Sequence, residues 1–73
     1  MKYRMKKYRI IGGEDNGRIV KVYNSGKNYW YHIGDWNNQG SPTFPDLKTT
    51  LFAIRFMRHA KLKLISDWVE KKG

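Results

Sequence analysis

The sequence predicts an α+β fold in which a three- or four-stranded antiparallel sheet packs against one long helix. Between residues 8 and 33, short runs of β-branched and aromatic residues alternate with turn-forming residues, as is typical of consecutive antiparallel strands. Over residues 43–60 the pattern changes to the spacing of an amphipathic helix. Because 73 residues make one small domain, we treat residues 1–73 as a single unit.

Three strands are expected before the helix, at residues 8–11, 18–24 and 28–33. The first turn contains Asn16-Gly17, a pair that tolerates positive φ, and the second turn occupies residues 24–27. These tight turns predict that successive strands are neighbours in the sheet.

The side chains of the third strand alternate between two faces, one made by Tyr29, Tyr31 and Ile33 and the other by Trp30 and His32. One face is expected to meet the helix, and the other to be at least partly solvated. Large aromatic residues are therefore predicted on the outside of the sheet.

The first nine residues carry five cations interleaved with Tyr3, Met5 and Tyr8. Apolar residues occupy odd positions up to Met5 and even positions from Tyr8 onwards. This change of phase indicates either a β-bulge or a loose basic arm, residues 1–5, that precedes the strand. The cations fit a phosphate-contacting segment and, equally, an edge strand protected by charge.

Residues 43–60 predict the long helix. Pro45 suits the first helical turn, and Thr43 or Asp46 is expected to cap the free N–H groups. One broad apolar face is formed by Phe52, Ala53, Phe56, Met57 and Ala60. We expect its three large side chains to be buried against the sheet, and the helix cations on the opposite side to be solvated.

The apolar arc of this helix is wider than one face. Leu47 and Leu51 lie outside the main face, so the arc suggests contact with more than one layer or with a partner. Val20 and Val22 are the sheet residues that we expect beneath the helix.

Residues 61–73 fit two patterns. Leu62, Leu64 and Trp68 fall on one face if the segment is a strand, and Ser66-Asp67 provides a cap if it is a short helix. We expect a fourth strand that begins near Leu62.

Residues 34–41 are predicted to be a loop that is polar except for Trp36. We expect Trp36 to fold back on the sheet, because Trp is largely buried on average. Presentation of Trp36 to a partner is the alternative.

The charge balance indicates the kind of partner. Fifteen Lys and Arg against six Asp and Glu give a net charge of +9, which favours nucleic acid, DNA or RNA, or an acidic protein surface, although such charge also serves solubility. The sequence has no cysteine, no apolar run long enough for a membrane span and no secretory signal. We therefore expect a cytoplasmic protein without a membrane partner. Because the expected core is small, a homodimer is also consistent with the sequence.

No sequence pattern indicates catalysis or cofactor binding. The six acidic residues are scattered, and the two acids that follow Gly12-Gly13 argue against a phosphate-cradling loop. His32 with Asp35 makes at most a partial metal site, since no third ligand is evident. We expect that the protein is not an enzyme and holds neither a cofactor nor a metal.

The segment Gly-Lys-Asn-Tyr-Trp-Tyr-His-Ile at residues 26–33, with Phe44 before the helix, follows a strand–strand–strand–helix order. Together with the basic and aromatic strands, it resembles in outline the three-stranded-sheet DNA-binding domains of the AP2 and integrase-arm types. The resemblance spans residues 8–60 and implies DNA binding. The Lys-rich style of the chain also resembles that of small orphan proteins encoded by bacteriophages.

Two functions are consistent with these features. The first is a nucleic-acid-binding module in which strand and arm cations contact phosphates while aromatic rings stack on bases. The second is a protein-binding inhibitor or adaptor, of the kind that a bacteriophage encodes, that docks on an acidic surface of a host protein. Both use the same candidate residues: Arg4, Lys6, Lys7, Arg9, Arg18, Lys21, Lys27, Tyr29, Trp30, Tyr31, Trp36, Arg55 and Arg58. A continuous stripe of cations favours the first function, and a compact aromatic patch with a charged rim favours the second.

Overall fold

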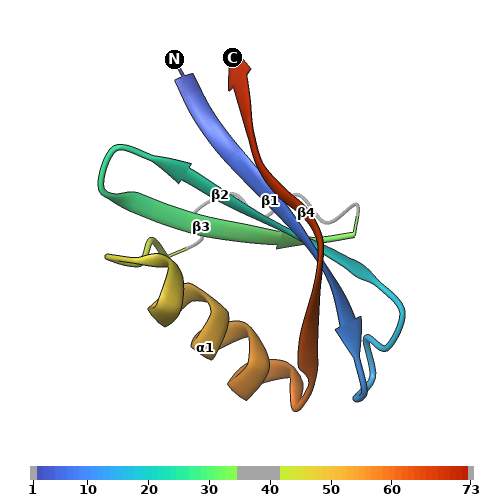
Figure 1. Ribbon diagram of the computed structural model, residues 1–73. Coiled ribbons are helices and arrows are strands. Elements are labelled where there is room, and N and C mark those ends of the chain that lie inside the picture. The colour runs from blue at the N-terminus through green and yellow to red at the C-terminus, as the bar shows by residue number, and fades with distance from the viewer. Residues whose placement is uncertain (1, 35–41, 73) are drawn as a thin grey trace.

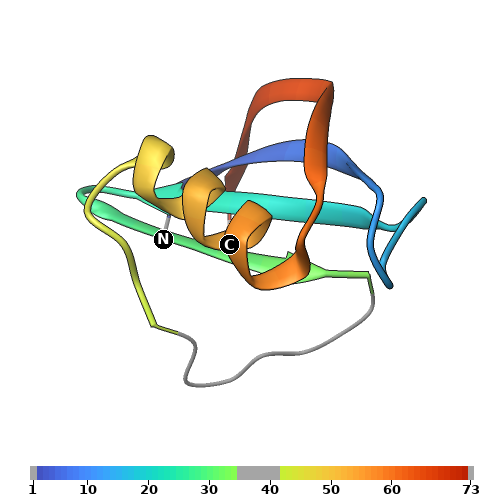
Figure 2. The same ribbon diagram turned by 90° about the horizontal axis from the view of Figure 1, so that it is seen from below.

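The computed structural model describes residues 2–34 and 42–72. Its elements are β1 (Lys2–Ile11), β2 (Ile19–Ser25), β3 (Asn28–Ile33), α1 (Leu47–Arg58) and β4 (Lys61–Lys72). The strands form one antiparallel sheet in the order β3-β2-β1-β4, and α1 lies across one of its faces (Figures 1 and 2). The predicted α+β class is confirmed, and the segment after the helix is a fourth strand.

β1 lies inside the sheet and pairs along both of its edges. Its register with β2 is continuous, and its pairing with β4 begins at Lys2↔Lys72, which brings the two ends of the chain side by side (Figure 1). Residues 2–5 are therefore part of the paired strand. From the sequence, a loose basic arm was one of the two alternatives for this segment.

The change of phase in β1 is not a bulge of that strand. Between the pairs Met5↔Val69 and Tyr8↔Leu64, β1 advances by three residues and β4 by five, so the additional residues lie in β4. The apolar residues of β1 change face instead. Tyr3 and Met5 point away from the helix, whereas Tyr8 and Ile10 point towards it.

The turn between β2 and β3 is the short hairpin that the sequence predicts. Gly26 and Lys27 are its two central residues, and Gly26 adopts a φ of 60°. The longer turn after β1 reaches the end of α1, where Gly13 has a φ of 70° and a Cβ would clash with the carbonyl oxygen of Arg58. Glycine is required at this contact because both the backbone conformation and the space exclude a side chain.

The helix begins later than the sequence predicts. Phe44 pairs with Tyr29 of β3 through two backbone hydrogen bonds of 2.8 and 3.1 Å, which hold the preceding chain in an extended form. Asp46 is the N-cap, and its Oδ1 accepts a 2.7 Å hydrogen bond from the N–H of Thr49. Pro45 precedes this cap and does not occupy the first turn.

The core lies between α1 and the sheet. Its buried side chains are Tyr8, Ile10, Val20, Val22, Ile33 and Ile54. Val20 and Val22 are fully buried, as predicted, and Ile54 supplies the central contact from the helix. The sheet face opposite α1, called the far face below, lies outside this core.

The helix buries a different stripe from the predicted one. Leu47, Thr50, Leu51 and Ile54 face the sheet at the i, i+3, i+4 and i+7 positions. The expectation that Phe52, Phe56 and Met57 are core residues is wrong, because all three are exposed.

The physical reason is that α1 carries two apolar stripes, and only one of them can pack against the single sheet face that the helix covers. The sheet already supplies the rings of Tyr8 and Tyr31 to the core, and compact aliphatic side chains fill the remaining space. Thr50 can be buried because its hydroxyl donates a 2.8 Å hydrogen bond to the carbonyl oxygen of Asp46.

Candidate partner-binding surfaces

The outward side of α1 carries an apolar patch of three residues, Phe52, Phe56 and Met57, called the α1 patch. Their exposed fractions are 59%, 67% and 65%. The rings of Phe52 and Phe56 stack with centroids 6.1 Å apart and planes inclined by 17°. The two rings, one turn apart, present a single ordered surface to solvent.

Cations border this patch along one side. At 100° per residue, Lys48 and Arg55 fall next to Phe52 on the outward side of α1, and both are exposed. The helix from Leu47 to Arg58 contains no acidic residue. The surface next to Phe52 is therefore basic, whereas Met57 lines a hollow together with Glu14 and Asp15 of the turn after β1.

Arg58, unlike Arg55, is held within the fold. Its Nη1 lies 3.2 Å from Oδ2 of Asp15, whose Oδ1 lies 3.5 Å from Nε of Arg18. One carboxylate thus serves two guanidinium groups, so the cluster of three residues keeps a net positive charge. Of the predicted pair Arg55 and Arg58, only Arg55 projects freely from the helix.

The far face of the sheet carries a row of cations. Lys7 and Lys21 are Cα partners on β1 and β2, and His32 of β3 continues the row. All three side chains are half-buried, and Arg9 lies two residues further along β1 on the same face. No acidic side chain of the described residues lies within 4.0 Å of either Lys7 or Lys21.

Next to this row, the far face carries an aromatic cluster that consists of Tyr3, Tyr23 and Trp30. Tyr23 stacks on Trp30 with centroids 5.6 Å apart and planes inclined by 8°, and Tyr3 packs against Tyr23 at 5.8 Å. Burial, and secondarily the neighbouring Tyr3, raises the pKa of Tyr23. Tyr23 therefore stays a neutral hydrogen-bond donor at physiological pH.

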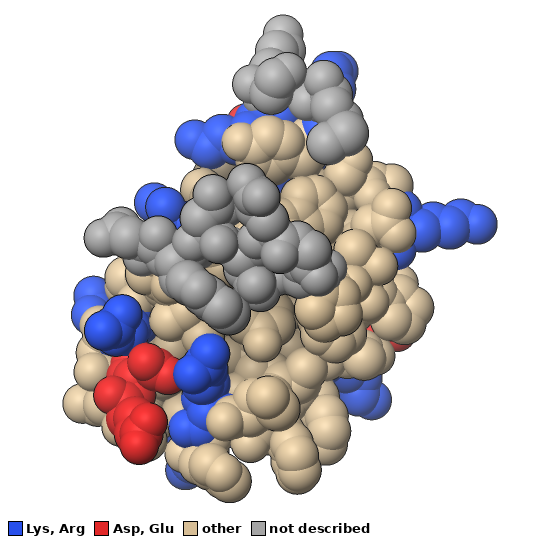
Figure 3. Space-filling model, turned by 180° about the vertical axis from the view of Figure 1, so that it is seen from behind, with Lys and Arg blue, Asp and Glu red and all other residues tan. Residues whose placement is uncertain are grey.

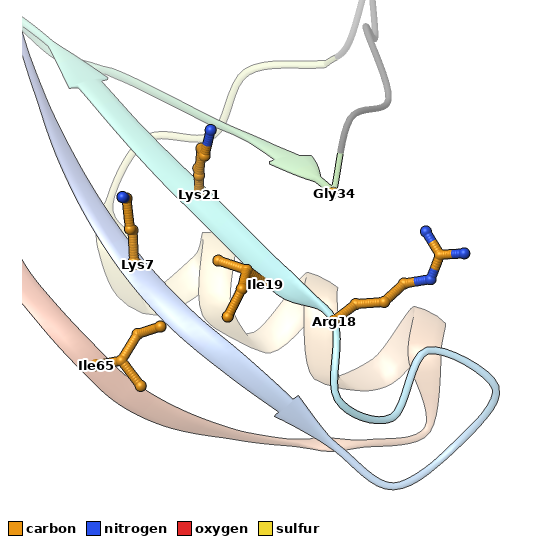
Figure 4. Close-up of a pocket in the computed structure, with 6 residues that line it drawn as sticks. All are labelled: Lys7, Arg18, Ile19, Lys21, Gly34 and Ile65. Carbon is orange, nitrogen blue, oxygen red and sulfur yellow. The ribbon is translucent and has the colours of Figure 1, made fainter.

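Lys7 and Lys21 line a hollow of about 420 Å³ together with Arg18, Ile19, Gly34 and Ile65 (Figure 4). In the close-up, Lys7 and Lys21 project to the same side from neighbouring strands, whereas Arg18, just before β2, extends away from them on the Gly34 side. Three cations and two isoleucines are thus among the residues that line the hollow.

The charges on the back of the molecule do not form one band. Figure 3, seen from behind Figure 1, shows Lys and Arg atoms around the margin, acidic atoms at one corner and mostly uncharged surface between them. No continuous stripe of cations crosses the visible part that the structure describes.

Arg4 and Lys6 lie on the helix side of the sheet, where the fold itself uses them. The Arg4 guanidinium lies 4.3 Å from the ring centroid of Trp68 and donates hydrogen bonds of 3.0 and 2.8 Å to Oδ1 of Asn24. Nζ of Lys6 lies 5.3 Å from the Trp68 ring and 3.5 Å from Asp67. These contacts tie β1, β2 and β4 together.

The remaining predicted site residues are spread over the molecule. Tyr29 and Tyr31 face the helix side, Lys27 is exposed in the β2–β3 turn, and Trp36 lies outside the described residues. The structure thus brings together Lys7, Arg18, Lys21 and Trp30, with Arg9 nearby, and Asp15 links Arg18 to Arg58 of the helix.

Sequence reasoning missed the α1 patch as a surface and did not include Tyr3, Tyr23 and His32 among the site residues. The width of the apolar arc on α1 was the available signal for the patch. Tyr23 lies two residues from Lys21, so strand alternation alone places both on the same face.

The described residues contain no group of three His, Cys, Asp or Glu side chains placed to hold a metal ion. The partial site predicted at His32 and Asp35 includes a residue outside the described ranges. Within the described part of the chain, no helix is long and apolar enough to cross a membrane.

Comparison with known proteins gives no match to a protein-family model, to a curated protein or to a solved structure. The resemblance to three-stranded DNA-binding domains therefore stays a likeness of element order, and the described fold adds β4 to that order. The surfaces themselves carry the functional argument.

Proposed function

We propose that this chain is a protein-binding module that docks through the α1 patch. The partner surface that fits it has an apolar recess bordered by acidic side chains. The observation that carries the proposal is the exposure of Phe52, Phe56 and Met57 on one short helix, with the two phenyl rings stacked on each other.

Exposed aromatic residues at this density are costly unless a partner covers them. Contiguous apolar patches on small soluble domains mark interaction sites more often than scattered single residues do. Phe52 and Phe56 stand at i and i+4, the spacing with which an amphipathic helix inserts two anchors into a groove. Because the rings are already stacked, little side-chain entropy remains to be lost on binding.

The charges next to the patch favour an acidic partner over a second copy of this chain. A two-fold symmetric dimer would place the same surface on both sides of the interface, so the cations of both copies would be brought into one interface. The helix offers no carboxylate to compensate, Asp15 beside Met57 is already paired with Arg18 and Arg58, and each chain carries a net charge of +9. An acidic rim removes this repulsion and also accelerates association.

The direct test compares Phe56→Ser with Val69→Ser, a change of another exposed apolar residue that lies on β4. Each variant is used to recover proteins from nuclease-treated lysate, and the recovered protein is then purified and titrated. We expect Phe56→Ser to raise Kd by about 30-fold or more, the loss of a hot-spot residue, and Val69→Ser to leave it nearly unchanged.

The charge contribution is tested with Arg55→Glu, which is expected to slow association with the same purified protein and to weaken its salt dependence. Equal binding by the wild type and Phe56→Ser contradicts docking through the α1 patch. A wild-type dimer in sedimentation analysis that Phe56→Ser converts to a monomer assigns the patch to self-association instead.

A further inference from the structure

We propose that the far face binds the phosphate backbone of a short single-stranded nucleic acid at the hollow lined by Lys7, Arg18 and Lys21. This surface lies on the side of the sheet opposite α1 (Figure 2). Asp15 connects Arg18 of the hollow to Arg58 of α1, but the two proposals are tested with different residues, so either can fail without the other.

The first argument is the pairing of like charges. Lys7 and Lys21 are directly opposite on neighbouring strands, an arrangement that destabilises a sheet. The ion pairs of the described residues use other cations, namely Lys6, Arg18 and Arg58. A bound anion removes the repulsion between Lys7 and Lys21, so the folded protein provides a site that gains from an anionic ligand.

The second argument is the shape and lining of the hollow. Arg18 shares its carboxylate, Asp15, with Arg58 and so retains attraction for a further anion. Ile19 and Ile65 contribute apolar walls that strengthen charge interactions compared with open water. Gly34 leaves room for the Arg18 guanidinium, because a Cβ there would lie 3.3 Å from Nη1.

The third argument selects nucleic acid among phosphate ligands. The aromatic cluster lies next to the lysines on the same face. Tyr23 is two residues after Lys21 on β2, and its Cα partner Trp30 is two residues before His32 on β3. Two residues of a strand span about 7 Å, which suits the reach from a backbone phosphate to its base. Sheet faces that combine cations with aromatic rings bind single strands by stacking on unpaired bases.

The footprint is short. The cations that line the hollow are Lys7, Arg18 and Lys21, so the proposed contact is limited to the phosphates that these three side chains reach. With three phosphates neutralised on a single strand, affinity is expected to fall with salt at a log–log slope of about −2, since each phosphate contributes roughly −0.7.

The experiment measures fluorescence anisotropy of a labelled single-stranded 12-mer, in DNA and RNA forms, against the full chain over a series of salt concentrations. The test variant is Lys7→Gln/Lys21→Gln, and the matched control is Lys48→Gln/Arg55→Gln, which removes the same charge from α1. We expect the test variant to flatten the slope by about 1.4, and the control to preserve it.

Trp30→Ala separates stacking from charge. It is expected to weaken single-strand binding by about 5- to 150-fold without changing the slope. Trp30→Phe keeps an aromatic ring and should restore most of the affinity, which excludes a purely structural effect. Thermal melts of each variant show that the fold is retained.

Four outcomes overturn the proposal. The first is no binding of the 12-mer at low salt, and the second is equal salt slopes for the test and control variants. The third is binding of a duplex with an affinity that Trp30→Ala does not change. The fourth is binding to vesicles of anionic lipid, or displacement by millimolar inorganic phosphate, with no preference for the 12-mer. Phe56→Ser should bind the 12-mer as the wild type does, so a failure here leaves the docking proposal intact.

Discussion

At the scale of single residues, Ile54 and Phe56 show how position on one helix decides what a side chain does. Ile54 is completely buried between α1 and the sheet, whereas Phe56, two residues later, is 67% exposed. The larger side chain is therefore the one that contributes less to folding. Under the docking proposal, its contribution is to the contact with a partner.

This contrast gives a prediction for stability. Ile54→Ala is expected to lower the free energy of unfolding by about 2–5 kcal/mol, because it removes buried methyl groups and leaves a cavity. Phe56→Ala should change it by no more than about 0.5 kcal/mol, as for other surface substitutions. Urea denaturation of the two variants measures both values. A large loss for Phe56→Ala would place that ring in the core.

Asp46 gives a prediction for pH dependence. The hydrogen bonds from Thr49 hold the pKa of the Asp46 carboxyl below its usual value. A lowered folded-state pKa stabilises the fold above the unfolded-state value and ceases to do so as pH falls through the folded-state value. The melting temperature should therefore decline below about pH 4, the usual range of an aspartate.

Asp46→Asn is the matched variant, since Asn also caps helices but does not titrate. It should show a smaller decline of the melting temperature between neutral and acid pH. Some decline is expected to remain, because a hydrogen bond from the N–H of Trp68 also lowers the pKa of Asp67. An unchanged acid profile in Asp46→Asn would contradict a role for the cap.

At the scale of elements, β1 combines two functions along its length. Its helix-side residues Arg4 and Lys6 join the sheet internally through Trp68, Asn24 and Asp67. On its far face, Lys7 is one of the cations proposed to bind a ligand, and Arg9 donates a 3.0 Å hydrogen bond to the carbonyl oxygen of Gly17. Strand alternation, with a period of two, places Arg4 and Lys6 on the opposite face from Lys7 and Arg9.

Removal of residues 1–5 is therefore expected to destabilise the protein. The deletion takes away pairing with both β2 and β4 and the stacking of Arg4 on Trp68. A lower midpoint in chemical denaturation, with Arg4→Ala showing part of the loss, is the expected result. If the shortened chain melts as the full chain does, the paired first half of β1 contributes no stability.

The strands were the most predictable elements of the fold. β-branched and aromatic runs between glycine-containing turns identified β2 and β3, and Asp46 was a recognisable cap. The face of α1 was not predictable, because two apolar stripes compete for one sheet and only the shape of the sheet surface selects between them. The hollow could not be predicted either, because Lys7 and Lys21 become neighbours only through the register of β1 and β2.

At the scale of the whole molecule, the two proposed surfaces lie on opposite sides of one sheet. α1 covers the helix side and presents its outward residues there, while the lysines and aromatic rings belong to the far face (Figures 1 and 2). A domain with two independent faces can hold a protein and a nucleic acid at the same time. The sheet then acts as a rigid spacer between the two partners.

The position of β1 between β2 and β4 has a consequence for how the chain is made. β1 is synthesised first, but one of its two neighbours, β4, begins 50 residues after β1 ends, from Ile11 to Lys61. At about 5–20 residues per second, this interval lasts on the order of 3–10 s. During that time one edge of β1 has no partner, and such an edge invites pairing with other nascent chains. We expect the dense cations of residues 2–9 to repel such pairing, and so to protect the growing chain before they take their places in the finished fold.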